Sequence, residues 1–204
     1  MFSPALSLFV GLLRFNRLGK GQHIICILAV FYLLNQSVAE WVGSKNISNY
    51  PFFHLSIVVE FSLLSWAFVA EQGVLFNRKF LMISIATFFL GSVLNAVWGE
   101  GLENAPSILL VVESCFLIVL VGAYFLKVYR QMTVMRIEQE FLFWLSMGIL
   151  VFFVGTILLS IFIEFITESE ELFFDIFLIR ASLIILTNIC YAIAMLCKAH
   201  PQKS

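Results

Sequence analysis

The chain has 204 residues, of which 61% are hydrophobic and 12% charged, with a formal net charge of −1 at pH 7 and a mean hydropathy of +1.00. Soluble domains typically carry about 25% charged residues, so the composition argues against a soluble protein, and the near-neutral charge gives no electrostatic case for a nucleic-acid partner. The apolar residues form continuous blocks of roughly twenty, the length that crosses a ~30 Å hydrocarbon layer. They lack the alternation of barrel strands. The sequence predicts an all-α fold, a polytopic transmembrane helical bundle in a single domain, residues 1–204, with no soluble domain.

The first apolar segment, Phe2–Leu13, is short for a crossing. It could span with the help of Arg14 and Arg17, whose long side chains reach the interface, or lie as an interfacial or re-entrant piece. Six longer blocks follow, and the last of them contains Arg180. They lie near residues 22–42, 51–70, 79–98, 106–126, 141–164 and 173–196. We expect seven spans if Phe2–Leu13 crosses and six if it does not.

Basic residues mark alternate connections between these blocks. Ten of them fall on one side, and Lys45 alone falls on the other; the ten are Arg14, Arg17, Lys20, Arg78, Lys79, Lys127, Arg130, Arg136, Lys198 and Lys203. Lysine- and arginine-rich connections stay in the cytoplasm. The sequence therefore predicts a multi-pass protein of the bacterial inner membrane with a cytoplasmic C-terminus, and with an external N-terminus in the seven-span arrangement.

Acidic residues show the opposite distribution. The outer connections or their edges hold Glu40, Glu100, Glu103, Glu164, Glu168, Glu170, Glu171 and Asp175. A solvated rim explains this pattern most simply. A vestibule that attracts cations is the alternative.

Three ionisable residues lie well inside apolar blocks: Glu60, Glu113 and Arg180. Such groups cost at least about 2.5–3.5 kcal/mol each on insertion, so each is a candidate for function. An unpaired guanidinium has no good partner at this depth. We therefore expect Arg180 to hydrogen-bond Glu113 or Glu60.

Other polar residues fall in the same outer half of the blocks, whereas the inner half has fewer strong polar groups. Tyr191 shares a helix face with Arg180 and Thr187 (i, i+7, i+11). The sequence predicts an outward-opening ligand-binding pocket formed by Glu60, Glu113, Arg180, Asn95, Gln36, His54 and Tyr191. The alternative role of the same charges is to lock helices together through buried salt bridges.

Signatures of enzymes and cofactors are missing from the sequence. No lysine lies in the middle of a block, as a retinal Schiff base requires, and the three histidines are too far apart to form a zinc or haem site. The four cysteines lie in apolar blocks without a Cys-x-x-Cys pair, and no Gly-x-Ser-x-Gly nucleophile motif is present. We expect no cofactor, no metal and a non-enzymatic role, with an acid-based lipid hydrolase as the enzyme class still open.

The order of several motifs resembles a family of small seven-helix integral membrane proteins, common in Bacteroidota and without a settled function. The matching residues are Asn49, His54-Leu55, Glu60-Phe61, Glu113, Phe143-Trp144, Gly148, Gly155, Asn188 and Tyr191-Ala192-Ile193. The resemblance covers nearly the whole chain and implies seven spans, with Phe2–Leu13 as the first. Arg180 departs from it, near a position where a polar residue or histidine is typical of the family.

The favoured functional hypothesis is a non-enzymatic, receptor-like membrane module that binds a small molecule, a lipid or a membrane partner through the outer polar pocket. A small transporter or proton-coupled carrier is the first alternative. An internal repeat favours this alternative. In two of the apolar blocks the sequence Val-Val-Glu follows a proline by a few turns, and it ends at Glu60 in one block and at Glu113 in the other. A structural accessory subunit of a larger membrane complex is the second alternative.

Overall fold

The computed structural model describes residues 3–45, 47–72, 78–131, 137–166 and 170–197, apart from the side chains of residues 3, 72, 131, 160–166, 170–175 and 177. These residues form seven α-helices and two short 3-10 turns. The helices are α1 (Ser3–Leu13), α2 (Lys20–Gly43), α3 (Tyr50–Gln72), α4 (Arg78–Trp98), α5 (Ser107–Gln131), α6 (Phe141–Ile166) and α7 (Glu170–Leu196). The turns are η1 (Phe15–Arg17) and η2 (Ile137–Gln139). The all-α prediction is confirmed.

Six of the helices, α2 to α7, are long and apolar enough to cross a membrane. Helix α1 has 11 residues, which at 1.5 Å per residue is about 16 Å, or half of a hydrocarbon layer. By length, six helices are candidates for crossing, and the seventh crossing by Phe2–Leu13 stays a prediction. The chain is a multi-pass helical membrane protein.

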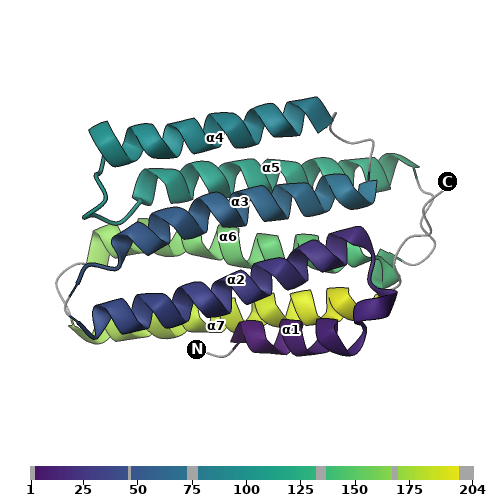
Figure 1. Ribbon diagram of the computed structural model, residues 1–204, viewed down its shortest axis with the longest axis horizontal. Helices are drawn as coiled ribbons and strands as arrows, with labels where there is room; N and C mark the ends of the chain where they lie inside the picture. Colours follow the sequence, from purple (N-terminus) through teal and green to yellow (C-terminus); the bar gives the residue numbers. More distant parts are fainter. Residues whose placement is uncertain (1–2, 46, 73–77, 132–136, 167–169, 198–204) are drawn as a thin grey trace.

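The six long helices run alternately up and down (Figure 1). We call one end of the bundle the basic end, because Arg14, Lys20, Arg78 and Arg130 lie at the helix termini there. The opposite end, with the connections after α2, α4 and α6, is called the acidic end; Glu40 and Glu100 lie there. The other predicted acidic residues of this rim, Glu164, Glu168, Glu170, Glu171 and Asp175, have side chains outside the described part of the chain.

Five helices enclose the interior of the bundle. Helix α2 packs on α3, α3 on α5, α5 on α6, and α6 on α7. Helix α1 packs between α2 and α7 and so closes the ring, but only along the half of the bundle nearest the basic end (Figure 1). Helix α4 lies outside the ring against α3, where the rings of Phe61 and Phe88 stack with centroids 4.2 Å apart.

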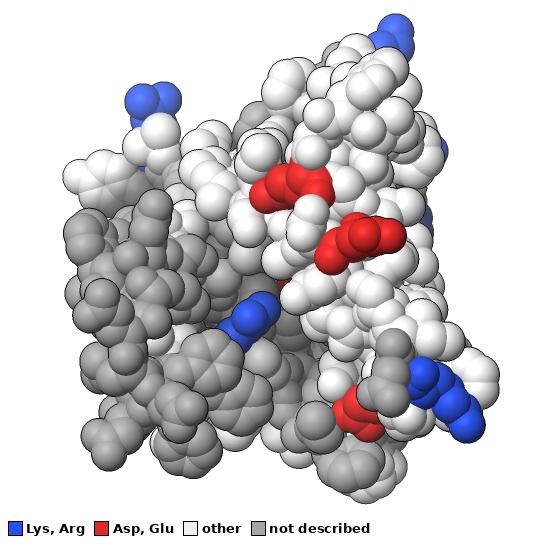
Figure 2. Space-filling model, turned by 90° about the vertical axis from the view of Figure 1, so that its left-hand side faces the viewer, with Lys and Arg blue, Asp and Glu red and all other residues white. Residues whose placement is uncertain are grey.

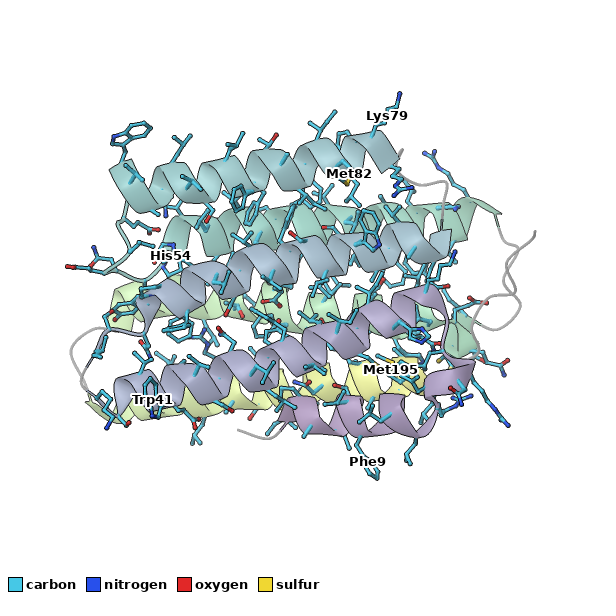
Figure 3. All side chains as sticks on the ribbon, viewed as in Figure 1. Phe9, Trp41, His54, Lys79, Met82 and Met195 are labelled. Carbon is cyan, nitrogen blue, oxygen red and sulfur yellow. The ribbon has the colours of Figure 1, made fainter. Side chains whose placement is uncertain are left out.

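The outer surface of the bundle is apolar, as contact with lipid requires. Figure 3 shows Phe9 pointing away from the bundle, and the exposed fractions of Phe9 and Trp41 are 61% and 65%. Met195, in contrast, is fully buried beside α1. Because apolar side chains cover both the interior and the lipid-facing surface, the polar interior residues stand out as the exceptions.

At the basic end, side chains from the α1–α2 connection cap α7. The Gln22 amide donates hydrogen bonds to the carbonyl oxygens of Ala194 (3.0 Å) and Cys197 (3.1 Å), while its oxygen accepts one from the Gly19 amide (2.8 Å). The Arg14 guanidinium donates to the carbonyl oxygens of Met195 and Leu196. The last carbonyl groups of a helix have no partners within it, so these contacts fix the end of α7 against α1 and α2.

Candidate functional site

Two glutamates meet inside the ring of helices. Glu60 lies in the middle of α3 and is 8% exposed, and Glu113 lies in the second turn of α5 and is 0% exposed. The two carboxyl groups are close enough for Glu60 to act electrostatically on Glu113. Like charges at such a range repel, so the pair does not stabilise the bundle as two carboxylates.

Two tyrosines lie near the glutamates in the interior. Tyr32, from α2, is within electrostatic range of the Glu60 carboxyl group. Tyr191, from α7, is 5% exposed and lies within electrostatic range of both Glu60 and Glu113. We call Tyr32, Glu60, Glu113 and Tyr191 the acid–tyrosine site.

Gly148 of α6 allows the Tyr191 ring to reach this position. A Cβ atom at Gly148 would lie 2.7 Å from Cε1 of Tyr191, so a larger residue would displace the ring. The neighbouring Thr187 hydroxyl donates a hydrogen bond to the Gly148 carbonyl oxygen (3.3 Å). The face of α7 that carries Thr187 and Tyr191 is therefore turned toward α6 and the interior.

The carboxyl group of Glu113 is unsatisfied. Neither of its oxygens has a hydrogen-bond partner among the described residues. Buried polar groups are nearly always hydrogen-bonded, because leaving one unpaired costs about 1–3 kcal/mol, and more when it is charged. Glu113 is therefore buried, and its carboxyl group forms no hydrogen bond with the described residues.

The predicted ion pair of Arg180 with Glu113 or Glu60 is not formed. Arg180 is exposed, and within the described chain no hydrogen bond joins it to Glu113, whose oxygens are both free. The sequence did not specify the rotation of α7, because a helix that is apolar all round gives no sign of which face is buried.

Gln36 and Asn95 form contacts elsewhere. Gln36 is exposed on α2 and donates to Glu40 (3.1 Å), and Asn95 donates to Glu100 (2.9 Å) at the end of α4. Glu100 also accepts from the Ile108 amide (3.2 Å), so this group organises the α4–α5 connection. The structure does not bring these two residues to the acid–tyrosine site.

His54 lies near the acidic end of α3, beside the α4–α5 connection (Figure 3). It is 4% exposed, and its Nε2 is 3.3 Å from the carbonyl oxygen of Asn104. Of the seven predicted pocket residues, the structure thus brings Glu60, Glu113 and Tyr191 together. Tyr32 was missed by the sequence analysis, since a single tyrosine in an apolar block is an ordinary interfacial or core residue.

One face of α7 changes from exposed to buried along its length. Arg180, Ile184, Thr187 and Tyr191 lie along this face; Arg180 is exposed and Ile184 is 36% exposed, whereas Thr187 and Tyr191 are each 5% exposed. The exposed part of the face is therefore the part nearer the acidic end. Figure 2, which views the acidic end, shows a hollow near its centre with a basic side chain at the edge.

Polar groups are also buried on the side of the site nearest the basic end. Ser65 of α3 and Ser146 of α6 are fully buried, and their hydroxyl oxygens have no hydrogen-bond partner in the described part of the chain. The expectation of an inner half with fewer strong polar groups stays a prediction, because these are small hydroxyl groups. Small hydroxyl groups are weak signals in a sequence, because serine on an apolar helix commonly bonds its own backbone.

The residues of the acid–tyrosine site indicate the chemistry of a ligand but do not specify an activity. Among the described residues, no three His, Cys, Asp or Glu side chains are grouped so that they could hold a metal ion. Two acids and two phenolic hydroxyls in an apolar interior provide hydrogen-bond acceptors, which suit a ligand that donates hydrogen bonds or carries positive charge.

Comparison with known proteins adds no further assignment: no family model, curated protein or solved structure matches the chain. The resemblance to small seven-helix proteins of Bacteroidota consequently stays a prediction.

Proposed function

We propose that this protein is a non-enzymatic membrane module that binds a small cationic ligand, carrying an ammonium group, at the acid–tyrosine site. The observation that carries the proposal is the unsatisfied carboxyl group of Glu113 beside Glu60. An acid inside the membrane costs at least about 2.5–3.5 kcal/mol. No hydrogen bond from the described chain to Glu113 offsets this cost, whereas a bound ammonium group would.

The tyrosines support the same ligand class. An ammonium group has three N–H donors and no acceptor, so it can use both carboxyl groups at once. Aromatic ring faces also attract cations, by about 0.5–2 kcal/mol each. Tyr32 and Tyr191 place two such rings within electrostatic range of Glu60 and Glu113.

The test is the binding of ethanolamine, a small primary ammonium ion, to the full chain in dodecyl maltoside micelles, measured by calorimetry. We expect saturable binding that Glu113→Gln weakens about tenfold or more, since a charge-assisted hydrogen bond is lost. Glu103→Gln is the matched control, because Glu103 is an exposed acid at the acidic end. Absence of binding, or equal loss in both variants, would refute the proposal.

A proton-coupled carrier is the second candidate. The buried hydroxyls of Ser65 and Ser146 favour it, because they extend the polar interior toward the basic end, and alternating access needs polar groups on both sides of the central site. Proteoliposomes distinguish the two functions. A carrier moves ethanolamine across the bilayer together with a change in internal pH, whereas a binding module releases none to the other side.

A further inference from the structure

One wall of the ring of helices depends on the short helix α1. Helices α2 and α7 have few direct contacts with each other, whereas α1 packs along both of them (Figure 1). The interior between α2 and α7 is therefore closed, along the half nearest the basic end, by a helix of 11 residues. Isolated helices of this length are marginally stable, so α1 keeps its place through its contacts with α2 and α7.

Helix α1 covers the face of α7 that carries Tyr191. Met195 lies one turn after Tyr191 on this face and is 0% exposed, and its Sδ atom is 3.9 Å from the position of a Cβ atom at Gly11 of α1. Tyr191 belongs to the acid–tyrosine site and lies within electrostatic range of Glu60. One helical turn, about 5.4 Å, thus separates the residue that α1 covers from a residue of the site.

The contacts that hold α1 are of two kinds. Gly11 allows a close approach to α2, where its nearest neighbour is the Sγ atom of Cys26. On the α7 side, the Arg14 guanidinium donates hydrogen bonds to the carbonyl oxygens of Met195 (3.2 Å) and Leu196. The last carbonyl groups of a helix can also bond water. The attachment of Arg14 to α7 can therefore be released without leaving these carbonyl groups unpaired.

We propose that α1 is a movable lid of the acid–tyrosine site, whose displacement opens the flank between α2 and α7 and admits the ammonium ligand. This inference rests on the proposed function. The Gln22 amide of α2 donates hydrogen bonds to the carbonyl oxygens of Ala194 (3.0 Å) and Cys197 (3.1 Å) at the end of α7. The two walls of the flank thus stay joined at the basic end while α1 moves.

A reversible disulfide tests the lid. In Gly11→Cys the added Cβ atom lies 4.0 Å from Cβ of the native Cys26, which suits a disulfide, where this distance is about 3.5–4.5 Å. We expect the oxidised variant to exchange bound and free ethanolamine about tenfold more slowly than wild type, with dithiothreitol restoring the rate. Line broadening in NMR spectra of ethanolamine measures the exchange on the full chain in dodecyl maltoside. Gly11→Cys combined with Cys26→Ala is the matched control, because it cannot form the disulfide.

Arg14→Gln tests the lid without a new covalent bond. Loss of the guanidinium releases α1 from the carbonyl oxygen of Met195, so we expect ethanolamine exchange to be about threefold to tenfold faster. Cys26, which is 6% exposed beside α1, should also react faster with N-ethylmaleimide, as measured by peptide mapping. Arg17→Gln is the matched control and should change neither rate, because Arg17 is an exposed basic residue of the neighbouring turn η1.

The outcomes separate the lid from the proposed function. Slower exchange in oxidised Gly11→Cys that the reductant reverses supports the lid, whereas equal rates before and after reduction overturn it and leave the cation site standing. Equal exchange rates in Arg14→Gln and Arg17→Gln overturn it in the same way if the disulfide does not form. If ethanolamine does not bind, the proposed function fails, and Cys26 labelling alone judges the lid: faster labelling in Arg14→Gln supports movement of α1, and unchanged labelling refutes it.

Discussion

At the residue scale, Glu113 and Gln22 are two buried polar residues with opposite surroundings. It is 0% exposed, and neither carboxyl oxygen has a hydrogen-bond partner in the described chain. Gln22 is the opposite case: it is 1% exposed, and its side chain forms three hydrogen bonds. Substituting each residue and measuring stability therefore distinguishes a buried polar group that stabilises the fold from one that does not.

We predict that Glu113→Met raises the free energy of unfolding by about 1–3 kcal/mol, because methionine is of similar volume and removes an unsatisfied buried group. Gln22→Leu should lower it by about 1–3 kcal/mol, because the variant strands two carbonyl oxygens and one amide. Unfolding of the full chain in mixed micelles measures both. A loss of stability in Glu113→Met as large as that in Gln22→Leu would show that Glu113 is a structural residue.

The sequence identified the acids but not their partners, for a physical reason. The insertion cost of Glu60 and Glu113 is a property of residue type and depth, which can be read along one block. Whether Arg180 or Tyr32 faces them depends on helix rotation, and α3 and α7 are apolar all round, so their patterns specify no inward face. Which side chains face each other inside the bundle therefore depends on close contacts between helices, such as the contact of Gly148 with Tyr191.

At the element scale, the contact between α6 and α7 positions the site. Small residues let helices approach in a membrane, where lipid provides no hydrophobic drive for association. Gly148 meets Tyr191, and Gly155 meets Leu183, with positions for a Cβ atom at 2.7 Å and 2.5 Å from the facing side chains. The two glycines thus set how far Tyr191 reaches toward Glu60.

We predict that Gly148→Ala weakens ethanolamine binding about tenfold and destabilises the fold by about 1–3 kcal/mol, because the new methyl group displaces the Tyr191 ring. Gly122→Ala is the matched control: nothing lies within 4 Å of a Cβ atom at Gly122 of α5, and alanine favours a helix. Calorimetry and micelle unfolding measure the two effects. Unchanged affinity in Gly148→Ala would mean that Tyr191 takes no part in the site.

At the scale of the whole molecule, the long helices and the basic residues together predict an orientation. Six helices are long enough to cross, which predicts that the two ends of the bundle lie on opposite sides of the membrane. The block lengths in the sequence were sufficient to predict these six. The length of the first segment did not determine whether α1 crosses the membrane, since about a dozen apolar residues can span with help from flanking residues, lie at the interface or re-enter.

We predict that a reporter active only outside the cytoplasm is active when inserted near Ser169 and inactive when inserted near Val134 or fused after Ser204. The physical reason is the excess of lysine and arginine at the basic end. Activity assays of the three fusions in bacterial cells measure the orientation. An active fusion at Val134 with an inactive one at Ser169 would place the acidic end in the cytoplasm.

The most direct test of the acid–tyrosine site is carboxyl labelling with dicyclohexylcarbodiimide, a hydrophobic reagent, followed by peptide mapping of the full chain in micelles. Glu60 is 8% exposed and Glu113 0%, so we predict modification at Glu60. Saturating ethanolamine should suppress this modification, while that of the exposed Glu103 is unchanged. Modification of Glu60 that persists undiminished in ethanolamine, or labelling of neither Glu60 nor Glu113, would contradict a ligand site at these acids.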